Sequence, residues 1–170
     1  MDVLTVQNPY AVLIAARIKR VVLIAARIKR VENRGWKPAP GRKGALYIHA
    51  GKEVPKLDAL RETVDWLRSD CGIKVDVNKL QTLCIASAGR IVCKGIVGDI
   101  HITQKTLPND QKPFFFEPYG WELGGIQPWL SVQVRGHLGI WHPTLDFKSL
   151  TVDAKTERAW VANVEALVLR

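Results

Sequence analysis

The chain has 170 residues, of which 47% are hydrophobic and 24% are charged, and its formal net charge is +9. This length suits one domain that buries its own core, and this composition excludes disorder of the whole chain. No uninterrupted apolar stretch reaches the roughly 18 residues of a membrane span, and the start Met1-Asp2-Val3 lacks the basic region of a signal peptide, so we expect a cytoplasmic protein without a membrane span.

The positive charge is concentrated near the start of the chain. Between Arg17 and Lys43 there are ten Lys or Arg residues and one acid, Glu32. Concentrated positive charge favours phosphate groups through the release of counterions. This distribution predicts that the first third of the chain meets a polyanion. A solvated basic face without a partner is the alternative.

The first elements are a short strand and a helix. Leu4-Thr5-Val6 has the composition of a strand, after which Asn8 is a candidate helix cap and Pro9 a first-turn proline. Residues 12–21, VLIAARIKRV, are repeated without change as residues 22–31. The repeat predicts a lengthened amphipathic helix with a basic face. Alternatively, one copy docks in the fold and the other loops out.

The duplication has a geometric consequence. Ten extra helical residues add about 15 Å of length, so the downstream chain cannot keep its place by simple extension. A lengthened amphipathic helix exposes apolar surface, and a homodimer through this helix is therefore one expectation.

The remaining elements follow from hydrophobic periodicity and from glycine and proline. Leucines at helical spacing predict a helix that ends at Gly72, and Gly89, Gly95 and Gly98 predict bulges or bends. The expected order is an extended segment at 29–36, a turn at Pro38, Pro40 and Gly41, a strand at 45–50, a helix at 57–71, strand-like runs over 80–104, a loop at 105–120, strands over 121–141 and a helix after Asp153.

This order predicts an α+β fold, a small β-barrel with flanking helices. The three cysteines, Cys71, Cys84 and Cys93, are odd in number and lack Cys-x-x-Cys spacing. We therefore expect reduced thiols in a cytoplasm, with no disulfide framework, metal site or cofactor.

Several segments together carry a resemblance to a known family. They are LTVQNPYAVLI at the start, IKRVENRGW at 28–36, LYIHAGK at 46–52, GIVGDI at 95–100, GWEL at 120–123 and VRGHLGIW at 134–141. In this order they resemble an ASCH domain, over residues 1–143, with residues 144–170 as a C-terminal extension. The resemblance implies a PUA-like barrel that binds RNA or a modified base.

The signature of that family is similar to Gly-x-Lys-x-x-Glu-x-Arg. Lys29, Glu32 and Arg34 stand at its last three positions, and Arg27 stands at the first in place of glycine. Lysine and arginine suit phosphate, and Glu32 between them could orient Lys29 or accept hydrogen bonds from a base. Because we expect these residues on different faces of an extended segment, a shared cleft requires a bend, for which Gly35 is the candidate. An internal salt-bridge cluster is the alternative.

Further candidates are basic and aromatic. Trp36, Tyr47, Trp121 and Trp141 could stack on a base, with Trp36 expected at a pocket mouth, although tryptophans in small barrels also form core. His49, close to Lys52, could titrate or contact phosphate, or be structural. The predicted nucleic-acid-binding set is Lys29, Arg34, Trp36, Tyr47, Lys52 and Arg135.

Three functions remain open at this point. The first is RNA or nucleotide binding through a basic, aromatic-lined cleft. The second is a hydrolase acting on RNA or a modified nucleoside, with Lys29, Glu32 and His49 as candidate catalytic residues. Related small amidohydrolases use a Lys, Thr and Glu set, and Glu32 occupies the threonine position, so that mechanism does not transfer. The third, also implied by the resemblance, is a transcription-coregulator interaction module.

Overall fold

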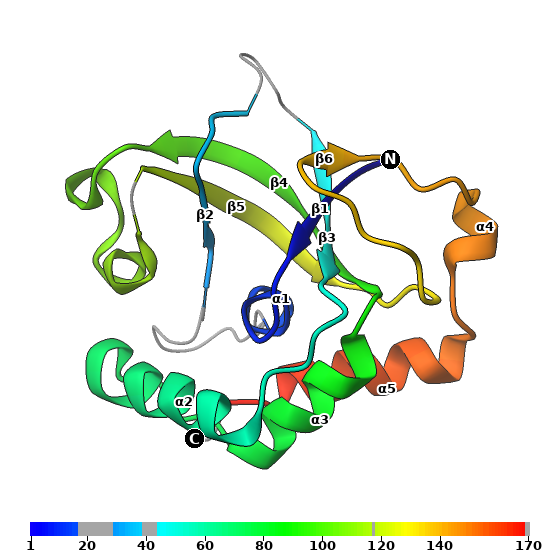
Figure 1. The fold of residues 1–170 in the computed structure, drawn as a ribbon, viewed down its shortest axis with the longest axis horizontal. Coiled ribbons are helices and arrows are strands. Elements are labelled where there is room, and N and C mark those ends of the chain that lie inside the picture. Colours follow the sequence, from blue (N-terminus) through cyan, green and yellow to red (C-terminus); the bar gives the residue numbers. More distant parts are fainter. Residues whose placement is uncertain (17–28, 39–43, 117, 169–170) are drawn as a thin grey trace.

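The computed structural model describes residues 1–16, 29–38, 44–116 and 118–168. It is an α+β fold in which a six-stranded sheet curls into a half-barrel (Figure 1). Strands β1 and β3 pair in parallel, and the other neighbours pair antiparallel. In spatial order the strands are β2 (Val31–Arg34), β5 (Tyr119–Pro128), β4 (Ile91–His101), β3 (Ala45–Ala50), β1 (Asp2–Val6) and β6 (Ile140–Trp141).

Helices fill and close the concave side of this sheet. The short helix α1 lies inside the curl, and α2, α3 and α5 lie below it (Figure 1). The helices are α1 (Tyr10–Ala15), α2 (Leu57–Cys71), α3 (Val77–Ser87), α4 (Phe147–Leu150) and α5 (Ala154–Glu165), with 3-10 turns at Gln104–Thr106 and Asn109–Phe114.

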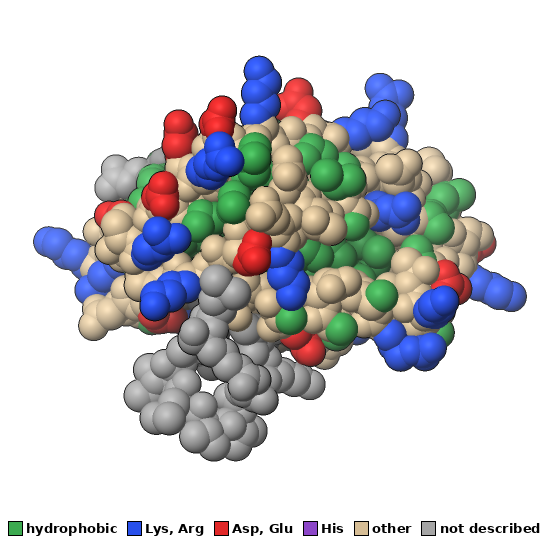
Figure 2. Space-filling model, turned by 90° about the horizontal axis from the view of Figure 1, so that it is seen from below, with side chains coloured by type: hydrophobic (Ala, Val, Ile, Leu, Met, Phe, Trp, Pro, Cys, Tyr) green, Lys and Arg blue, Asp and Glu red, His purple; other side chains and the backbone are tan. Residues whose placement is uncertain are grey.

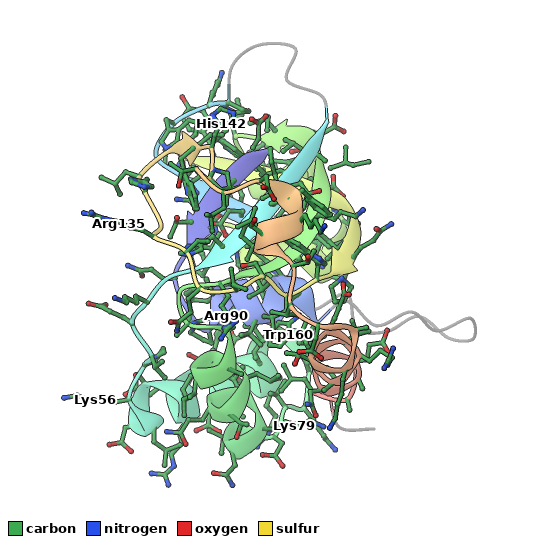
Figure 3. All side chains as sticks on the ribbon, turned by 90° about the vertical axis from the view of Figure 1, so that its right-hand side faces the viewer. Lys56, Lys79, Arg90, Arg135, His142 and Trp160 are labelled. Carbon is green, nitrogen blue, oxygen red and sulfur yellow. The ribbon has the colours of Figure 1, made fainter. Side chains whose placement is uncertain are left out.

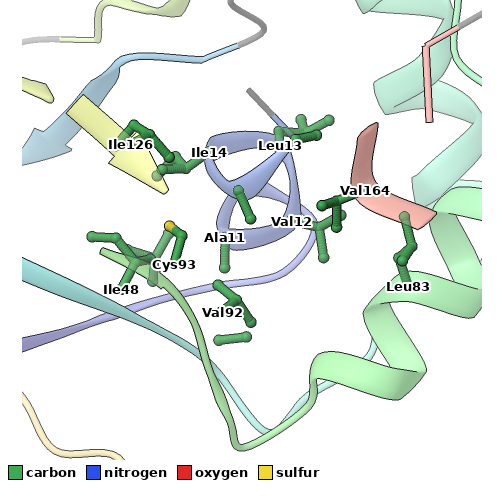
Figure 4. Packing of buried hydrophobic residues seen from close by; sticks show 14 of the residues in the cluster. Ala11, Val12, Leu13, Ile14, Ile48, Leu83, Val92, Cys93, Ile126 and Val164 are labelled. Atoms are coloured by element: carbon green, nitrogen blue, oxygen red, sulfur yellow. The ribbon is translucent and has the colours of Figure 1, made fainter. Parts of the chain in front are cut away.

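The core is built around α1. Each side chain from Ala11 to Ala15 is at most 1% exposed. Ile14 points toward Ile126 of β5, and Val12 points toward Val164 of α5 (Figure 4). The described part of the predicted amphipathic helix is thus buried on all sides. The rest of that prediction, residues 17–28, lies outside the described residues, as do residues 39–43 of the predicted turn.

The cap predicted at Asn8 is wrong. Pro9 occupies the N-cap position of α1, and no side chain caps the helix. The Asn8 amide instead donates to the Cys84 carbonyl oxygen at 3.3 Å and to Ser87 Oγ at 3.4 Å. The side chain therefore joins the start of α1 to the end of α3, where a buried amide needs partners.

Helix α2 follows the predicted pattern. It ends at Cys71, and Gly72 takes the left-handed conformation with φ +67° that favours glycine. The strand expected from residue 80 is wrong up to Ser87, because these residues belong to α3. Asp76 caps that helix by accepting from the backbone N–H groups of Asn78 and Lys79.

Glycines in β4 allow the sheet to curl. The register between β4 and β5 shifts between Lys94 and Ile96, and again between Val97 and Ile100, which confirms the irregularities predicted at Gly95 and Gly98. At Gly95 an added Cβ would lie 2.5 Å from Ile126 Cδ1, so a side chain there would obstruct the close approach of β5.

The C-terminal residues pack into the main core. Helix α5 begins after Asp153, which caps it, as the sequence predicts. Trp160 is 3% exposed and donates its indole N–H to the Val92 carbonyl oxygen at 3.1 Å. Among the described residues, no helix combines the length and the apolar character that crossing a membrane requires.

Candidate functional site

A cavity of about 1090 Å³ lies where the two edges of the half-barrel face each other. Strand β2 supplies one wall, and the ends of β1 and β3 supply another. The loop before β6 and the start of α1 complete it. The charged and titratable residues on its walls are Lys29, Glu32, Arg34, His49, Lys52, Arg135 and His137.

Three of the predicted residues form one ion cluster on the wall. Glu32 Oε2 accepts from Lys29 Nζ at 3.0 Å, and Glu32 Oε1 pairs with Arg34 Nη2 at 2.9 Å. Glu32 and Arg34 are two residues apart on β2 and so share a face, and Lys29 reaches them from just before the strand. A bend does lie at Gly35, but it follows β2 along the chain, and Glu32 and Arg34 share a face of the strand without it.

Lys29 is held by protein partners. Its side chain is 3% exposed, and its ammonium group donates to the Val31 carbonyl oxygen as well as to Glu32. The same ammonium lies 5.5 Å from the centroid of the Tyr10 ring. Lys29 therefore acts first as the counter-charge of Glu32, which matches the internal salt-bridge alternative.

Arg34 joins the two edges of the half-barrel. Its Nη2 donates to the Thr5 carbonyl oxygen of β1 at 2.6 Å in addition to pairing with Glu32. Its Nε–H is enclosed by the protein and has no hydrogen-bond partner among the described residues. A buried donor without a partner is costly, and because this one is enclosed, a ligand would have to meet another part of the guanidinium group.

His49 is the second wall residue with an unpartnered buried atom. The side chain is 2% exposed, and Nε2 lies 3.2 Å from the Val134 carbonyl oxygen. A carbonyl only accepts, so Nε2 carries the proton, and Nδ1 is an enclosed acceptor with no partner in the part of the chain that the structure describes. Burial lowers the pKa of His49, against hydrogen bonds to the Val134 and Gly89 backbone that raise it. The neutral ring is thus favoured at neutral pH.

The cavity also carries two exposed cations. Lys52 follows β3, and Arg135 projects outward from the loop before β6 (Figure 3). In the part of the chain that the structure describes, neither pairs with a carboxylate. The described wall therefore holds four cationic side chains against one acidic side chain.

The face built by α2, α3 and α5 carries charges of both signs, unlike the mainly cationic wall of the cavity. There, basic and acidic side chains are interspersed around a hydrophobic band (Figure 2). Two exposed ion pairs on α2, Arg61 with Asp58 and Arg68 with Asp65, contribute to this mixture. A mixed surface attracts polyanions less than the cavity does, because neighbouring opposite charges cancel at a distance.

The predicted aromatic residues lie outside the described wall of the cavity. Trp121 is fully buried, and Trp36, 37% exposed, packs edge-on against it with ring centroids 4.7 Å apart. Tyr47 packs against Trp129, and Trp141 packs against His49. The aromatic wall residues are instead Tyr10 and Phe116, the latter 54% exposed.

Sequence reasoning missed most of the neutral wall. Thr5, Tyr10 and Phe116 come from three separate segments, and residues 133–139 form one side. At Gly136 an added Cβ would lie 2.8 Å from His49 Nδ1 and 2.9 Å from Thr5 Oγ1. The motif Arg-Gly-His-Leu-Gly at 135–139 was the available signal, since glycines flanking polar residues mark close backbone approach.

A comparison of the sequence with models of protein families finds no match, and a comparison with curated proteins finds none.

Proposed function

We propose that the cavity binds a nucleotide, free or within single-stranded RNA, and that the chain is a PUA-like barrel of the ASCH type. The observation that carries the proposal is the charge of the described wall, four cationic side chains against one acid. The curled half-barrel sheet is compatible with such a barrel. The resemblance of the sequence segments favours the same ligand class.

The free cations are the groups that would meet phosphate. Lys52 and Arg135 are exposed at the cavity and have no carboxylate partner among the described residues. Lysine binds phosphate as a compact charge and arginine as a two-pronged donor. Phe116 is exposed on the same wall and offers a ring on which an unstacked base can lie.

The test is fluorescence anisotropy of labelled single-stranded RNA, duplex RNA and DNA at several salt concentrations. We expect single-stranded RNA to bind with a clear salt dependence. The double variant Lys52→Ala/Arg135→Ala should flatten the slope of log K against log salt by about 0.7 per lost phosphate contact. The matched control is Lys74→Ala/Arg158→Ala, which removes the same charges at exposed positions off the cavity wall.

Two outcomes would refute the proposal. One is the absence of binding to any of the three nucleic acids. The other is equal loss of affinity in the cavity variant and in the control variant, because net charge alone would then explain the binding.

A hydrolase is the second candidate, and one observation favours it. His49 lines the cavity with a neutral ring, and a neutral imidazole is a suitable general base once a substrate displaces the residues that enclose its Nδ1. Incubation of the labelled RNA with the protein, followed by gel analysis, tests this alternative. Cleavage that disappears in a His49→Gln variant would support it, and intact RNA after long incubation would exclude it for that substrate.

A further inference from the structure

We propose that the Glu32–Arg34 pair reads the base of the bound nucleotide and that the base it selects is guanine. The inference rests on the proposed nucleotide binding and adds its specificity. It follows from the order of hydrogen-bond donors and acceptors on the inner wall of the cavity.

Glu32 supplies the acceptors. It is the acidic side chain on the described wall, and it is 6% exposed. A carboxylate offers about four lone-pair positions, and the protein uses one on each oxygen, for Lys29 and for Arg34. The two oxygens therefore keep capacity to accept further hydrogen bonds from a ligand.

Arg34 supplies a donor directly beside these acceptors. Its Nη2 lies 2.9 Å from Glu32 Oε1, and its Nη1 amino group makes no hydrogen bond to a described residue and is not enclosed by the protein. The bond from Nη2 to the Thr5 carbonyl oxygen fixes the guanidinium plane across the opening of the half-barrel. The wall thus presents one donor next to a pair of acceptor oxygens in a fixed arrangement.

The neighbouring amides offer less to a ligand. The Asn33 amide donates to the Phe114 carbonyl oxygen at 2.8 Å and accepts from the Phe116 N–H at 2.7 Å. Gln133 donates to the Ala88 carbonyl oxygen at 3.3 Å. These contacts occupy the Asn33 and Gln133 amides and hold the loop segments in place. The exposed Gln7 amide is neutral, so the stronger, charge-assisted contacts to a base fall to Glu32 and Arg34.

The Watson–Crick edge of guanine complements this arrangement. Guanine presents one acceptor, O6, beside two donors, N1–H and the N2 amino group. Both donors can reach one carboxylate while O6 faces an arginine. Adenine and cytosine each place one amino donor next to ring acceptors, and uracil has one imino donor between two carbonyl oxygens. Guanine therefore makes the largest number of hydrogen bonds here, and a missing partner is strongly penalised in a buried site.

The charge of the cavity fits the rest of the nucleotide. With the base at Glu32 and Arg34, the phosphate is directed toward the exposed Lys52 and Arg135. The volume of about 1090 Å³ accommodates one nucleotide with its hydration.

The experiment is isothermal titration calorimetry of the unmodified protein with GMP, IMP, AMP, CMP and UMP. IMP differs from GMP by lacking the N2 amino group. We expect GMP to bind at least about 10-fold more tightly than UMP, and IMP to bind about 10-fold more weakly than GMP. A Glu32→Gln variant, checked for folding by circular dichroism, should lose the preference for GMP over IMP.

The outcomes separate this inference from the proposed function. Equal affinity for the five nucleotides, or a preference for another base, would overturn guanine selection and leave nucleotide binding in place. Absence of binding to all five nucleotides, together with absence of RNA binding, would overturn both. Because the GMP to IMP ratio is measured on the unmodified protein, the inference stays testable even where Glu32→Gln does not fold.

Discussion

The buried ion cluster predicts that replacing Glu32 costs more stability than replacing Lys29. Glu32 is paired with two cations, Lys29 at 3.0 Å and Arg34 at 2.9 Å. Replacing Glu32 by Gln leaves both cations without their carboxylate, and Lys29 is then an uncompensated charge at 3% exposure. Breaking a buried pair from one side costs about 3 to 5 kcal/mol. We expect a loss in that range for Glu32→Gln.

The reverse change should cost less. Lys29→Met leaves Glu32 paired with Arg34, so the remaining charges still balance. The loss is then that of two charge-assisted hydrogen bonds, to Glu32 and to the Val31 carbonyl oxygen, offset by the desolvation cost that a buried ammonium carries and by the apolar contacts of the new methionine. We therefore expect Lys29→Met to cost less than Glu32→Gln, about 1 to 2 kcal/mol.

Urea denaturation followed by circular dichroism measures both losses. The control is Asp65→Asn, which removes a carboxylate from an exposed pair with Arg68 and should change the unfolding free energy by less than about 0.5 kcal/mol. The reasoning is refuted if Lys29→Met is at least as destabilising as Glu32→Gln. It is also refuted if both variants behave like the control.

Three further predictions concern other parts of the site. Gly136→Ala forces a Cβ to within 2.8 Å of His49 Nδ1 and should cost about 1 to 3 kcal/mol in thermal or urea unfolding, whereas Gly35→Ala, with open space around it, should cost much less. Burial lowers the pKa of His49, so the unfolded state is protonated at a higher pH than the folded state. The contribution of His49 to the free energy of unfolding is therefore complete above about pH 6.5 and decreases as the pH falls below it. Unfolding measured from pH 7.5 to pH 5 should therefore be less steeply pH-dependent in His49→Gln. Deleting residues 17–26 restores a single copy of the repeat and should preserve RNA binding, because every charged residue of the described wall lies outside that range.

Regular elements could be predicted where periodicity and end signals agree. The helix over Leu57–Cys71 has apolar residues at helical spacing and Gly72 as its stop, and the strand Ala45–Ala50 has the expected composition. Helix α3 was missed although Asp76 offers a capping signal, because its apolar residues do not separate clearly from its polar ones. Packing against α1 and α2, rather than the local sequence pattern, makes this segment a helix.

The site could be predicted only in part. Lys29, Glu32 and Arg34 lie close together in sequence, but the expectation that they project to different faces is wrong for Glu32 and Arg34, which are two residues apart on β2 and share a face. The partners that complete the cavity come from far along the chain. Arg34 meets Thr5 across the opening of the sheet, and His49 meets Val134, and neither contact has a signal in local sequence.

Two of the described cations in the first third of the chain are already paired with carboxylates of the protein. Lys29 is bound to Glu32, and Arg30 pairs with Glu122 at 3.1 Å and with Asp110 at 3.5 Å. These two charges stabilise the sheet edge and contribute little field outside it. Among the described residues of the cavity, the cations without a carboxylate partner are Lys52 and Arg135. If the cavity binds nucleotides, affinity should therefore respond more to these two residues than to Lys29 and Arg30, whose charges are already paired.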